Sequence, residues 1–315
     1  MIESMNAVRT HSWGAPEVLT YELAPRPAAE AGEVLIRVHA ASINPVDCKT
    51  RSGGGFAKRL GNEPFPVILG WDVAGVVEAL GPESTGFSIG DAVYGCIRFP
   101  NLGNAYAEYA TAPVEHLAHI PAGLGMAEAA ALPLAVLTAW QALDAIDLQP
   151  GQRTVIVGAA GGVGHLAVQL AKRRGAEVVG VAGRKNQGFV LELGADEAID
   201  YSSGDLAALV GEADVIFDAV GGGTVAALSP VVSAGGAIVS IVGGVKPDAL
   251  PEGILGKNIM IRPSGEQLVE VSEMVAARRL RPVVQEVISA SDAARAHSLS
   301  DAGHVRGKLV LDLSQ

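Results

Sequence analysis

Cysteine is scarce in this chain of 315 residues. Cys48 and Cys96 are its only two cysteines, and they lie far apart rather than in a C-x-x-C pair. A structural zinc site made of four thiolates cannot be built from two cysteines, so that class of site is excluded. The simplest expectation is a cytosolic protein with two free thiols.

Long apolar runs are also missing. The longest, residues 129–140, is too short to cross a membrane and contains Pro133. The first residues, MIESMNAVRTHSW, contain no apolar segment, so we do not expect a secretory signal.

Positive charge is in the minority. The chain has 23 Lys and Arg against 34 Asp and Glu, a formal net charge of −11 at pH 7. Nucleic acids and anionic membranes are bound through basic surfaces, so neither is expected as the main partner.

The first third of the chain has the pattern of a β-rich domain. Segments rich in branched residues follow one another closely, separated by Gly, Pro and Asn. The predicted strands are residues 32–43, 73–80, 91–97 and 105–112. Short strands at this spacing suggest an irregular barrel.

The pattern changes near Glu128. Residues 127–146 favour a helix by composition and periodicity, despite Pro133, and from Arg153 strands alternate with helices. The predicted strands are residues 154–158, 177–183, 197–201, 214–220, 237–243 and 258–262. The predicted helices between them are residues 163–175, 186–194, 206–212 and 222–232. This alternation predicts an α/β fold with a doubly wound parallel sheet of the Rossmann type.

The end of the chain departs from that alternation. Residues 265–280 are expected to form a helix, and VRGKLVLDL (residues 305–313) a strand that returns to the first domain. We therefore expect two domains, one of residues 1–124 with 262–315 and one of residues 125–261.

A glycine loop, GAAGGVG, joins the first predicted strand of the second domain to its helix. Gly158, Gly161 and Gly164 are spaced three apart, with Gly162 and Val163 between the last two. Such glycines allow a tight turn, close approach to a pyrophosphate and close packing of helix on strand. The helix N-terminus then presents free N–H groups to the phosphates. The context favours dinucleotide binding over a turn kept for packing alone.

The end of the next strand bears on the choice of cofactor. NAD enzymes usually place an acidic residue there for the ribose 2′-OH, but residues 178–184 read VVGVAGR and contain none. Gly183 is followed by Arg184 and Lys185, and a guanidinium suits a phosphate. This favours NADPH over NADH. The alternative is that both basic residues are simply solvated at the start of the next helix.

Several segments together resemble the medium-chain dehydrogenase/reductases, and within them the zinc-free quinone oxidoreductase branch. The segments that carry this resemblance, which covers nearly the whole chain, are SINPVDCKTRSG (42–53), GWDVAGVVEALG (70–81), GFSIGDAVYG (86–95), AYAEYA (105–110), LPLAVLTAWQAL (132–143), GAAGGVG (158–164), LGADEAIDY (193–201) and GHVRGKLVL (303–311). The resemblance implies that the first domain is GroES-like and is completed by the C-terminal segment. It also implies a homodimer.

The resemblance also implies what the metal positions contain. Zinc-dependent relatives use Cys, a His-Glu pair and Cys, and the matching positions here are Asn44, Trp71 with Asp72, and about Leu134. This set cannot reproduce a Cys/His/Cys zinc site. Without a Lewis acid, the expected acceptor is one already electrophilic, a quinone or an α,β-unsaturated carbonyl compound. The protein would then mainly position the hydride donor and support the developing oxyanion.

Two residues are candidates for catalysis. The resemblance places Asn44 near the nicotinamide and the acceptor, although an Asn before Pro45 is also a common turn element. Lys49 stands where many relatives carry Tyr. It would be a proton donor if burial lowered its pKa, or it would pair with Asp47 or a cofactor phosphate. Tyr94 and Tyr106 are rival proton donors.

The remaining cofactor contacts are assigned partly by resemblance and partly by the rule that ligands bind at the carboxyl ends of parallel strands. They are Thr138, Tyr201, Ile241, Val242, Gly243 and Lys308. We interpret Cys48 as a buried thiol without activation.

Two other functions fit the same motifs. An enoyl-thioester reductase would need a basic entrance for CoA or carrier phosphates, and residues 51–66 are the clearest basic segment. A non-catalytic NADPH-binding protein is the other alternative, because a glycine loop argues for binding only.

Overall fold

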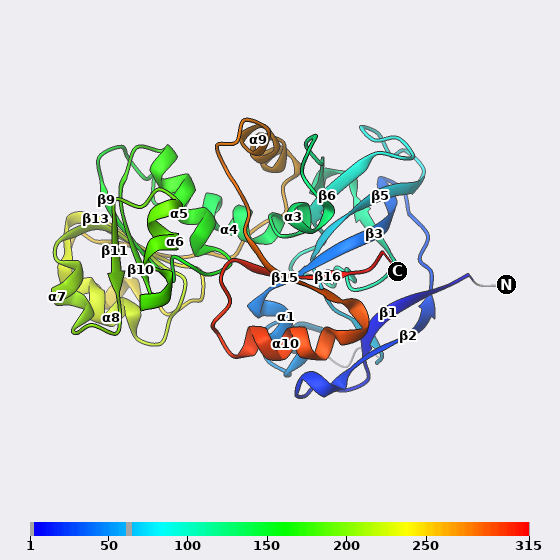
Figure 1. Ribbon diagram of the computed structural model, residues 1–315, viewed down its shortest axis with the longest axis horizontal. Helices are drawn as coiled ribbons and strands as arrows, with labels where there is room; N and C mark the ends of the chain where they lie inside the picture. Colours follow the sequence, from blue (N-terminus) through cyan, green and yellow to red (C-terminus); the bar gives the residue numbers. More distant parts are fainter. Residues whose placement is uncertain (1–2, 61–64, 315) are drawn as a thin grey trace. The chain divides into compact units, whose positions relative to one another are not determined.

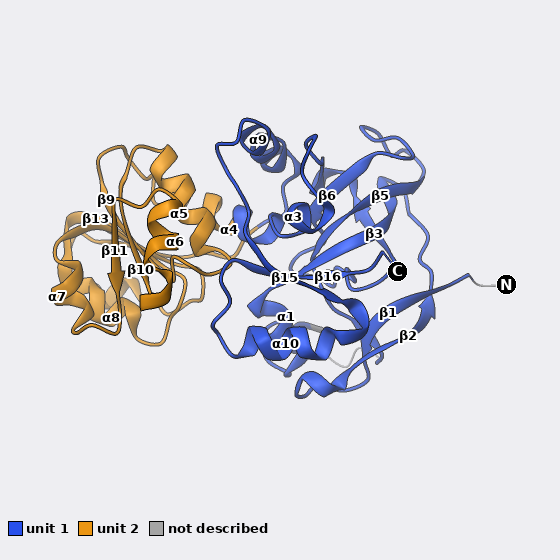
Figure 2. Cartoon of the chain, in the orientation of Figure 1, with its two compact units in different colours: residues 1–137, 262–315 blue, residues 138–261 orange. Residues whose placement is uncertain are grey.

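The computed structural model describes residues 3–60 and 65–314, and divides the chain into two compact units. Unit 1 comprises residues 1–137 and 262–315, and unit 2 comprises residues 138–261 (Figure 2). The second boundary falls where the sequence suggested. The first falls later than residue 124, because the helix following Gly125 packs on the sheet of unit 1. No helix in the described part of the chain is long and apolar enough to cross a membrane.

Unit 2 is the predicted parallel sheet. Its six strands lie in the order β11-β10-β9-β12-β13-β14, and every pairing is parallel. The strands are β9 (Arg153–Val157), β10 (Glu177–Ala182), β11 (Glu197–Asp200), β12 (Ala213–Asp218), β13 (Val232–Ser240) and β14 (Leu255–Asn258). The helices are α5 (Gly164–Arg173), α6 (Gln187–Glu192), α7 (Leu206–Val210) and α8 (Thr224–Leu228). The strand order turns back at β9, as a doubly wound sheet requires.

Two local predictions were wrong. The last strand was expected at residues 258–262, but β14 ends at Asn258, and after Ile259 donates to the Ser240 carbonyl the chain leaves the sheet. The single helix expected over residues 127–146 is two, α3 (Met126–Ala130) and α4 (Pro133–Ala145). Proline has no N–H and clashes with the preceding turn, so Pro133 begins a helix instead of lying inside one.

Unit 1 is β-rich, as predicted. It has a three-stranded sheet, β2-β1-β4, and a seven-stranded sheet, β15-β16-β3-β5-β6-β8, in which β7 also pairs with β3. Its strands are β1 (Ser4–Thr10), β2 (Leu19–Pro25), β3 (Glu33–Ile43), β4 (Val67–Ile68), β5 (Asp72–Leu80), β6 (Ala92–Cys96), β7 (Tyr109–Pro113), β8 (Leu117–His119), β15 (Val284–Ser289) and β16 (Lys308–Asp312). Its other helices are α1 (Pro45–Arg51), α2 (Ala57–Leu60), α9 (Gly265–Ala276) and α10 (Ala293–Asp301).

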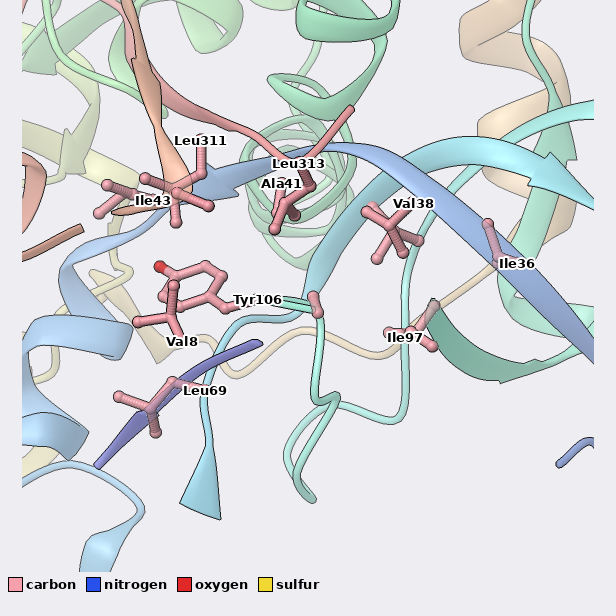
Figure 3. Close-up of a cluster of buried hydrophobic side chains, with 14 of the residues drawn as sticks. Val8, Ile36, Val38, Ala41, Ile43, Leu69, Ile97, Tyr106, Leu311 and Leu313 are labelled. Atoms are coloured by element: carbon pink, nitrogen blue, oxygen red, sulfur yellow. The ribbon is translucent and has the colours of Figure 1, made fainter. Parts of the chain in front are cut away.

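The C-terminal segment completes unit 1, as expected. Strand β16 pairs antiparallel with β3, with Leu309 opposite Ile43, and the red and blue ribbons lie side by side in Figure 1. The core beneath them brings together residues far apart in sequence. Figure 3 shows Val8, Ile43, Tyr106 and Leu311 in one cluster, all nearly inaccessible to solvent. This packing fixes the junction between β3 and α1, where Asn44 lies.

Candidate active site

Asn44 links the end of β3 to the start of α1, and its side chain is held on both sides. Its Oδ1 accepts a hydrogen bond from Lys308 Nζ at 2.6 Å, and its Nδ2 donates to Asp72 Oδ2 at 2.8 Å. Lys308 also donates to the Ile43 carbonyl at 2.7 Å. Asn44 and Lys308 are each 2% exposed and Asp72 is fully buried, so water competes little for these bonds.

Asp72 is bonded on both carboxylate oxygens. Ser42 Oγ donates to Oδ2 at 2.6 Å, and the Leu134 backbone N–H donates to Oδ1 at 2.7 Å. The structure thus brings together Asn44, Asp72 and Leu134, which come from the three segments that resemblance matches to the zinc site of zinc-dependent relatives. Sequence alone placed them in three separate segments.

A second carboxylate lies in the same buried region. Asp47 Oδ2 accepts from the Asn44 backbone N–H at 2.7 Å. Burial is the main cause that raises the pKa of Asp47, to about 7, and the negative charge of Asp72 adds to it. Burial also raises the pKa of Asp72 and lowers that of Lys308, because both lose hydration of the charged form.

Lys49 lies apart from this network. It is exposed on α1, whose buried face carries Asp47, Cys48, Thr50 and Arg51. The sequence-based prediction of a proton-donating Lys49 depends on burial of its side chain, and within unit 1 the side chain is exposed. Its catalytic role stays a prediction.

The rival proton donors are both buried. Tyr94 OH donates to the Leu268 carbonyl at 2.8 Å, and burial raises its pKa. Tyr106 is fully buried, and burial likewise raises its pKa, with the negative charge of the neighbouring Asp47 adding to the effect. Neither phenol is placed to give up a proton easily.

Cys48 is the buried thiol that the sequence suggested, 4% exposed, and burial raises its pKa to about 12. Its neighbour was not expected, because it lies about 250 residues away in sequence: His297 Nδ1 lies 3.4 Å from the sulfur and 3.3 Å from Arg51 Nη1. Burial and the Arg51 charge lower the pKa of His297 to about 3, so the imidazole is neutral and does not activate the thiol.

The glycine loop of unit 2 has the geometry of a phosphate cradle. Gly158 has φ of +82°, a conformation that favours glycine. A Cβ on Gly164 would lie 2.0 Å from the Gly158 carbonyl oxygen, so only glycine lets α5 begin this close to β9. The residues therefore fit a pyrophosphate at the N-terminus of α5.

A carboxylate that was not expected from the sequence, Asp200, lies beside the end of β10, the strand end that bears on the choice between NADH and NADPH. Arg184 is highly exposed, and its Nε donates to Asp200 Oδ2 at 3.1 Å. Asp200 ends β11 in register with Ala182, so a carboxylate does lie beside this strand end. It also accepts from the Ser202 N–H and hydroxyl, and Ser202 and Arg184 lower its pKa to about 2. Parallel register was the signal that could have located it.

Tyr201 lies against Gly183. A Cβ placed on Gly183 would come within 3.5 Å of the tyrosine ring and hydroxyl, and the ring itself is 56% exposed. Gly183, Arg184 and Tyr201 therefore gather at one surface of unit 2, and Lys185 is also exposed there.

The other expected cofactor residues occupy varied environments. Ile241, Val242 and Gly243 follow the carboxyl end of β13, the end at which ligands of such sheets bind, and Val242 is 40% exposed. Thr138 is 6% exposed within α4. Gly162 and Val163 complete the loop before α5. Within unit 1, the nitrogen of Lys308 contacts Ile43 and Asn44. These assignments stay predictions.

The basic segment suggested as an entrance for a thioester substrate, residues 51–66, exposes fewer of its positive charges than its sequence contains. Arg51 is 3% exposed, and its Nη2 bonds to Asp301 at 2.8 Å. Lys58 and Arg59 are exposed, and residues 61–64 lie outside the described part of the chain.

Comparison with known proteins identifies the family. Residues 30–122 match the alcohol dehydrogenase GroES-like domain, and residues 193–311 match the zinc-binding dehydrogenase family. A 2-methylene-furan-3-one reductase of Solanum lycopersicum is 33% identical, covering 98% of this chain and 79% of its own length. The chain is a medium-chain dehydrogenase/reductase.

Two further relatives agree with this family. A chloroplastic NADPH-dependent alkenal/one oxidoreductase of Arabidopsis thaliana is 33% identical over 90% of this chain and 73% of its own. A solved quinone oxidoreductase from Coxiella burnetii superposes with a TM-score of 0.93 at 36% identity, covering 98% of this chain and 99% of that one. This dehydrogenase/reductase is therefore an oxidoreductase that uses a nicotinamide cofactor.

One matched family is described as zinc-binding, so the donor set of this dehydrogenase/reductase matters. Zinc sites use thiolate, imidazole and carboxylate donors. Here the matching positions offer an amide (Asn44), an indole (Trp71) and an apolar side chain (about Leu134). The carboxylate of Asp72 already accepts from Ser42, Asn44 and Leu134, and the ammonium of Lys308 already occupies the Asn44 oxygen. A metal ion there would meet a buried positive charge. These residues do not fit a catalytic zinc.

Proposed function

We propose that this protein is a zinc-independent, NADPH-dependent reductase of quinones or α,β-unsaturated carbonyl compounds. The observation that carries the proposal is the buried network in which Asn44 and Asp72, which resemblance matches to the metal site of zinc-dependent relatives, are bonded to each other and Asn44 is bonded to Lys308. Without a Lewis acid to polarise a plain ketone or alcohol, the acceptor must already be electrophilic. Relatives described as quinone and alkenal/one oxidoreductases support the same acceptor classes.

The preference for NADPH is supported by the end of β10. Arg184 is bonded to Asp200 through Nε, and its Nη groups make no hydrogen bond to any described residue. A guanidinium held in this way can bind a 2′-phosphate through its remaining donors. The nearby carboxylate already accepts from Ser202 and Arg184, which leaves it less suited to a ribose 2′-OH.

When bound, NADPH supplies the hydride. The chain's own contribution would be to bind the pyrophosphate at the loop Gly158–Gly164, to orient the acceptor oxygen through the Asn44 amide, and to deliver a proton. The proton would come from Lys49 on α1 or from water, and the variant Lys49→Met distinguishes the two. A hydrogen bond from Asn44 to the acceptor oxygen would stabilise the enolate or phenolate as it forms.

One assay tests the proposal. The purified protein is titrated with NADPH and NADH, and oxidation of the cofactor is followed with a panel of quinones, enones and enoyl-CoA, with and without a chelator. We expect tighter binding of NADPH, turnover of quinones or enones, and no effect of chelation. Preference for NADH would overturn the role of Arg184, and loss of activity on chelation would overturn zinc independence. Turnover of enoyl-CoA alone would favour a thioester reductase, and tight NADPH binding without turnover would favour a non-catalytic role.

Two further parts of the proposal concern assembly and location. We propose a homodimer, to be tested by the mass of the purified protein in solution. We propose a reducing compartment such as the cytosol, which is supported by two free and buried cysteines. Mitochondrial and chloroplast relatives exist, so localisation in cells is the direct test.

A further inference from the structure

The Asn44 side chain can adopt only one of its two amide orientations. An ammonium can only donate hydrogen bonds, so the atom 2.6 Å from Lys308 Nζ must be the amide oxygen. An ionised carboxylate can only accept, so the atom 2.8 Å from Asp72 Oδ2 must be the amide nitrogen. Turning the amide over would place oxygen against oxygen and N–H groups against the ammonium.

The two partners of the amide are themselves fixed. Lys308 begins β16 and is anchored on the Ile43 carbonyl, while Asp72 begins β5 and is bonded by Ser42 and Leu134. All the side chains of this network belong to unit 1 and are at most 2% exposed. Three paired strands therefore support the orientation of one side chain.

One donor of Asn44 is left over. Its Oδ1 bonds to Lys308 and one Nδ2 hydrogen bonds to Asp72, while the second Nδ2 hydrogen has no acceptor among the described residues. Lys308 withdraws electron density from the amide through Oδ1, which makes the remaining N–H a stronger donor.

We propose that Lys308 and Asp72 are positioning residues that hold the Asn44 amide in a single orientation, with one polarised N–H aimed at the carbonyl oxygen of the acceptor. Lys308 thus acts through Asn44. This inference rests on the proposed function, because the acceptor oxygen is the ligand that the N–H would meet.

A double-mutant cycle tests the coupling. Turnover of NADPH with a quinone or enone is measured for wild type, Asn44→Ala, Lys308→Met and the double variant. Lys172→Met is the matched control, because Lys172 also pairs with an aspartate, Asp196 at 2.7 Å, but in unit 2. We expect kcat to fall about 100-fold for Asn44→Ala, as for loss of an oxyanion donor, and about 10-fold for Lys308→Met. The double variant should be no slower than Asn44→Ala within about twofold, and the control should match wild type. If the fold-losses in kcat of the two single variants multiplied in the double variant, the proposal would be overturned.

A second measurement does not depend on turnover. The side-chain amide resonances of Asn44 in ¹⁵N-labelled protein are assigned by their disappearance in Asn44→Asp. We expect Lys308→Met to shift these resonances and to speed their exchange with water at least tenfold, while Lys172→Met leaves them unchanged. Resonances unaffected by Lys308→Met would refute the positioning role. If wild type reduces no acceptor but the resonances respond as expected, the proposed function is refuted. The fixed orientation of the Asn44 amide is then still supported.

The lysine variant leaves two carboxylates without their cation and is liable to misfold. Asp72→Asn then serves in its place, because it keeps the shape of the side chain. Leu134 and Asn44 donate to different oxygens of Asp72, and a carboxamide has only one oxygen, so it cannot accept at both places. The same shift, faster exchange and non-additive loss of kcat are therefore expected. Additive losses or unchanged resonances would again overturn the proposal.

Discussion

A graded set of alanine substitutions at three glycines of unit 2 tests the phosphate cradle. A Cβ on Gly164 would lie 2.0 Å from the Gly158 carbonyl oxygen, whereas a Cβ on Gly161 would lie 3.3 Å from the same atom. A Cβ on Gly188, exposed in α6, would meet nothing within 4 Å. Ordinary contact begins near 3.4 Å, so Gly164→Ala must displace the loop by more than an ångström and Gly161→Ala by about a tenth.

The expected magnitudes follow from these distances. Overpacking of a rigid site costs about 1–3 kcal/mol, and a loss of that size in binding weakens NADPH affinity by about 5- to 150-fold. Gly164→Ala should show such a loss together with a lower Tm. Gly161→Ala should stay within about fivefold of wild type, since its free-energy cost is below about 1 kcal/mol. Gly188→Ala should bind NADPH normally and gain about 0.5–1 kcal/mol of stability, because alanine is the better helix residue.

Calorimetric titration with NADPH and thermal unfolding without it separate binding from folding. The reasoning is refuted if Gly164→Ala binds NADPH as tightly as wild type, or if Gly188→Ala loses affinity to the same extent. Either result would mean that the closeness of α5 to β9 does not set the binding of the pyrophosphate.

Three other predictions can be checked separately. Gly183 has φ of −69° and ψ of 157°, and a Cβ there would make only an ordinary 3.5 Å contact with Tyr201, so Gly183→Asp should fold and shift the preference toward NADH, as measured by the ratio of the two Kd values. Lys49→Met should lower kcat by about 10²-fold if Lys49 is the proton donor, and an unchanged kcat would remove it from that role. The buried His297, with a pKa of about 3, stays neutral while the unfolded chain takes up a proton below its ordinary value of 6.5. Wild type should therefore lose stability relative to His297→Leu as pH falls from 7 to 5, by about 2 kcal/mol, and parallel denaturation curves across this range would contradict the assignment.

The fold was predictable because its signal is repeated along the chain. Alternating strands and helices from Arg153 onward predict a parallel sheet many times over, so misplacing β14 by a few residues does not alter the architecture. The split of the helix at Pro133 depends on a single residue and not on a repeated pattern. Composition over a window of 20 residues favours a helix, but one missing N–H decides where it begins.

The strand-end carboxylate could not be found by reading one strand. The absence of an acidic residue in residues 178–184 is correct, yet Asp200 reaches the same surface from β11. Parallel pairing with Ala182 places it there, and pairing is a property of the sheet rather than of either segment. The proposed preference for NADPH therefore depends on a salt bridge that orients Arg184 as well as on a missing carboxylate.

The network around Asn44 also could not be predicted from any one segment of the sequence. Resemblance placed Asn44 near the nicotinamide and the acceptor and placed Lys308 near the cofactor, but sequence does not say which way a lysine points. The antiparallel register of β16 on β3, with Leu309 opposite Ile43, places the Lys308 nitrogen beside Asn44. Burying an ammonium and two carboxylates costs more free energy than their attraction reliably returns, so such a network is a poor source of stability. Its geometry does accomplish one thing that apolar residues of the same volume would not, which is to give the Asn44 amide a single orientation. A variant that replaces Lys308, Asp72 and Asn44 together with apolar residues should therefore keep most of its stability and lose its turnover, whereas a purely structural network would lose stability first.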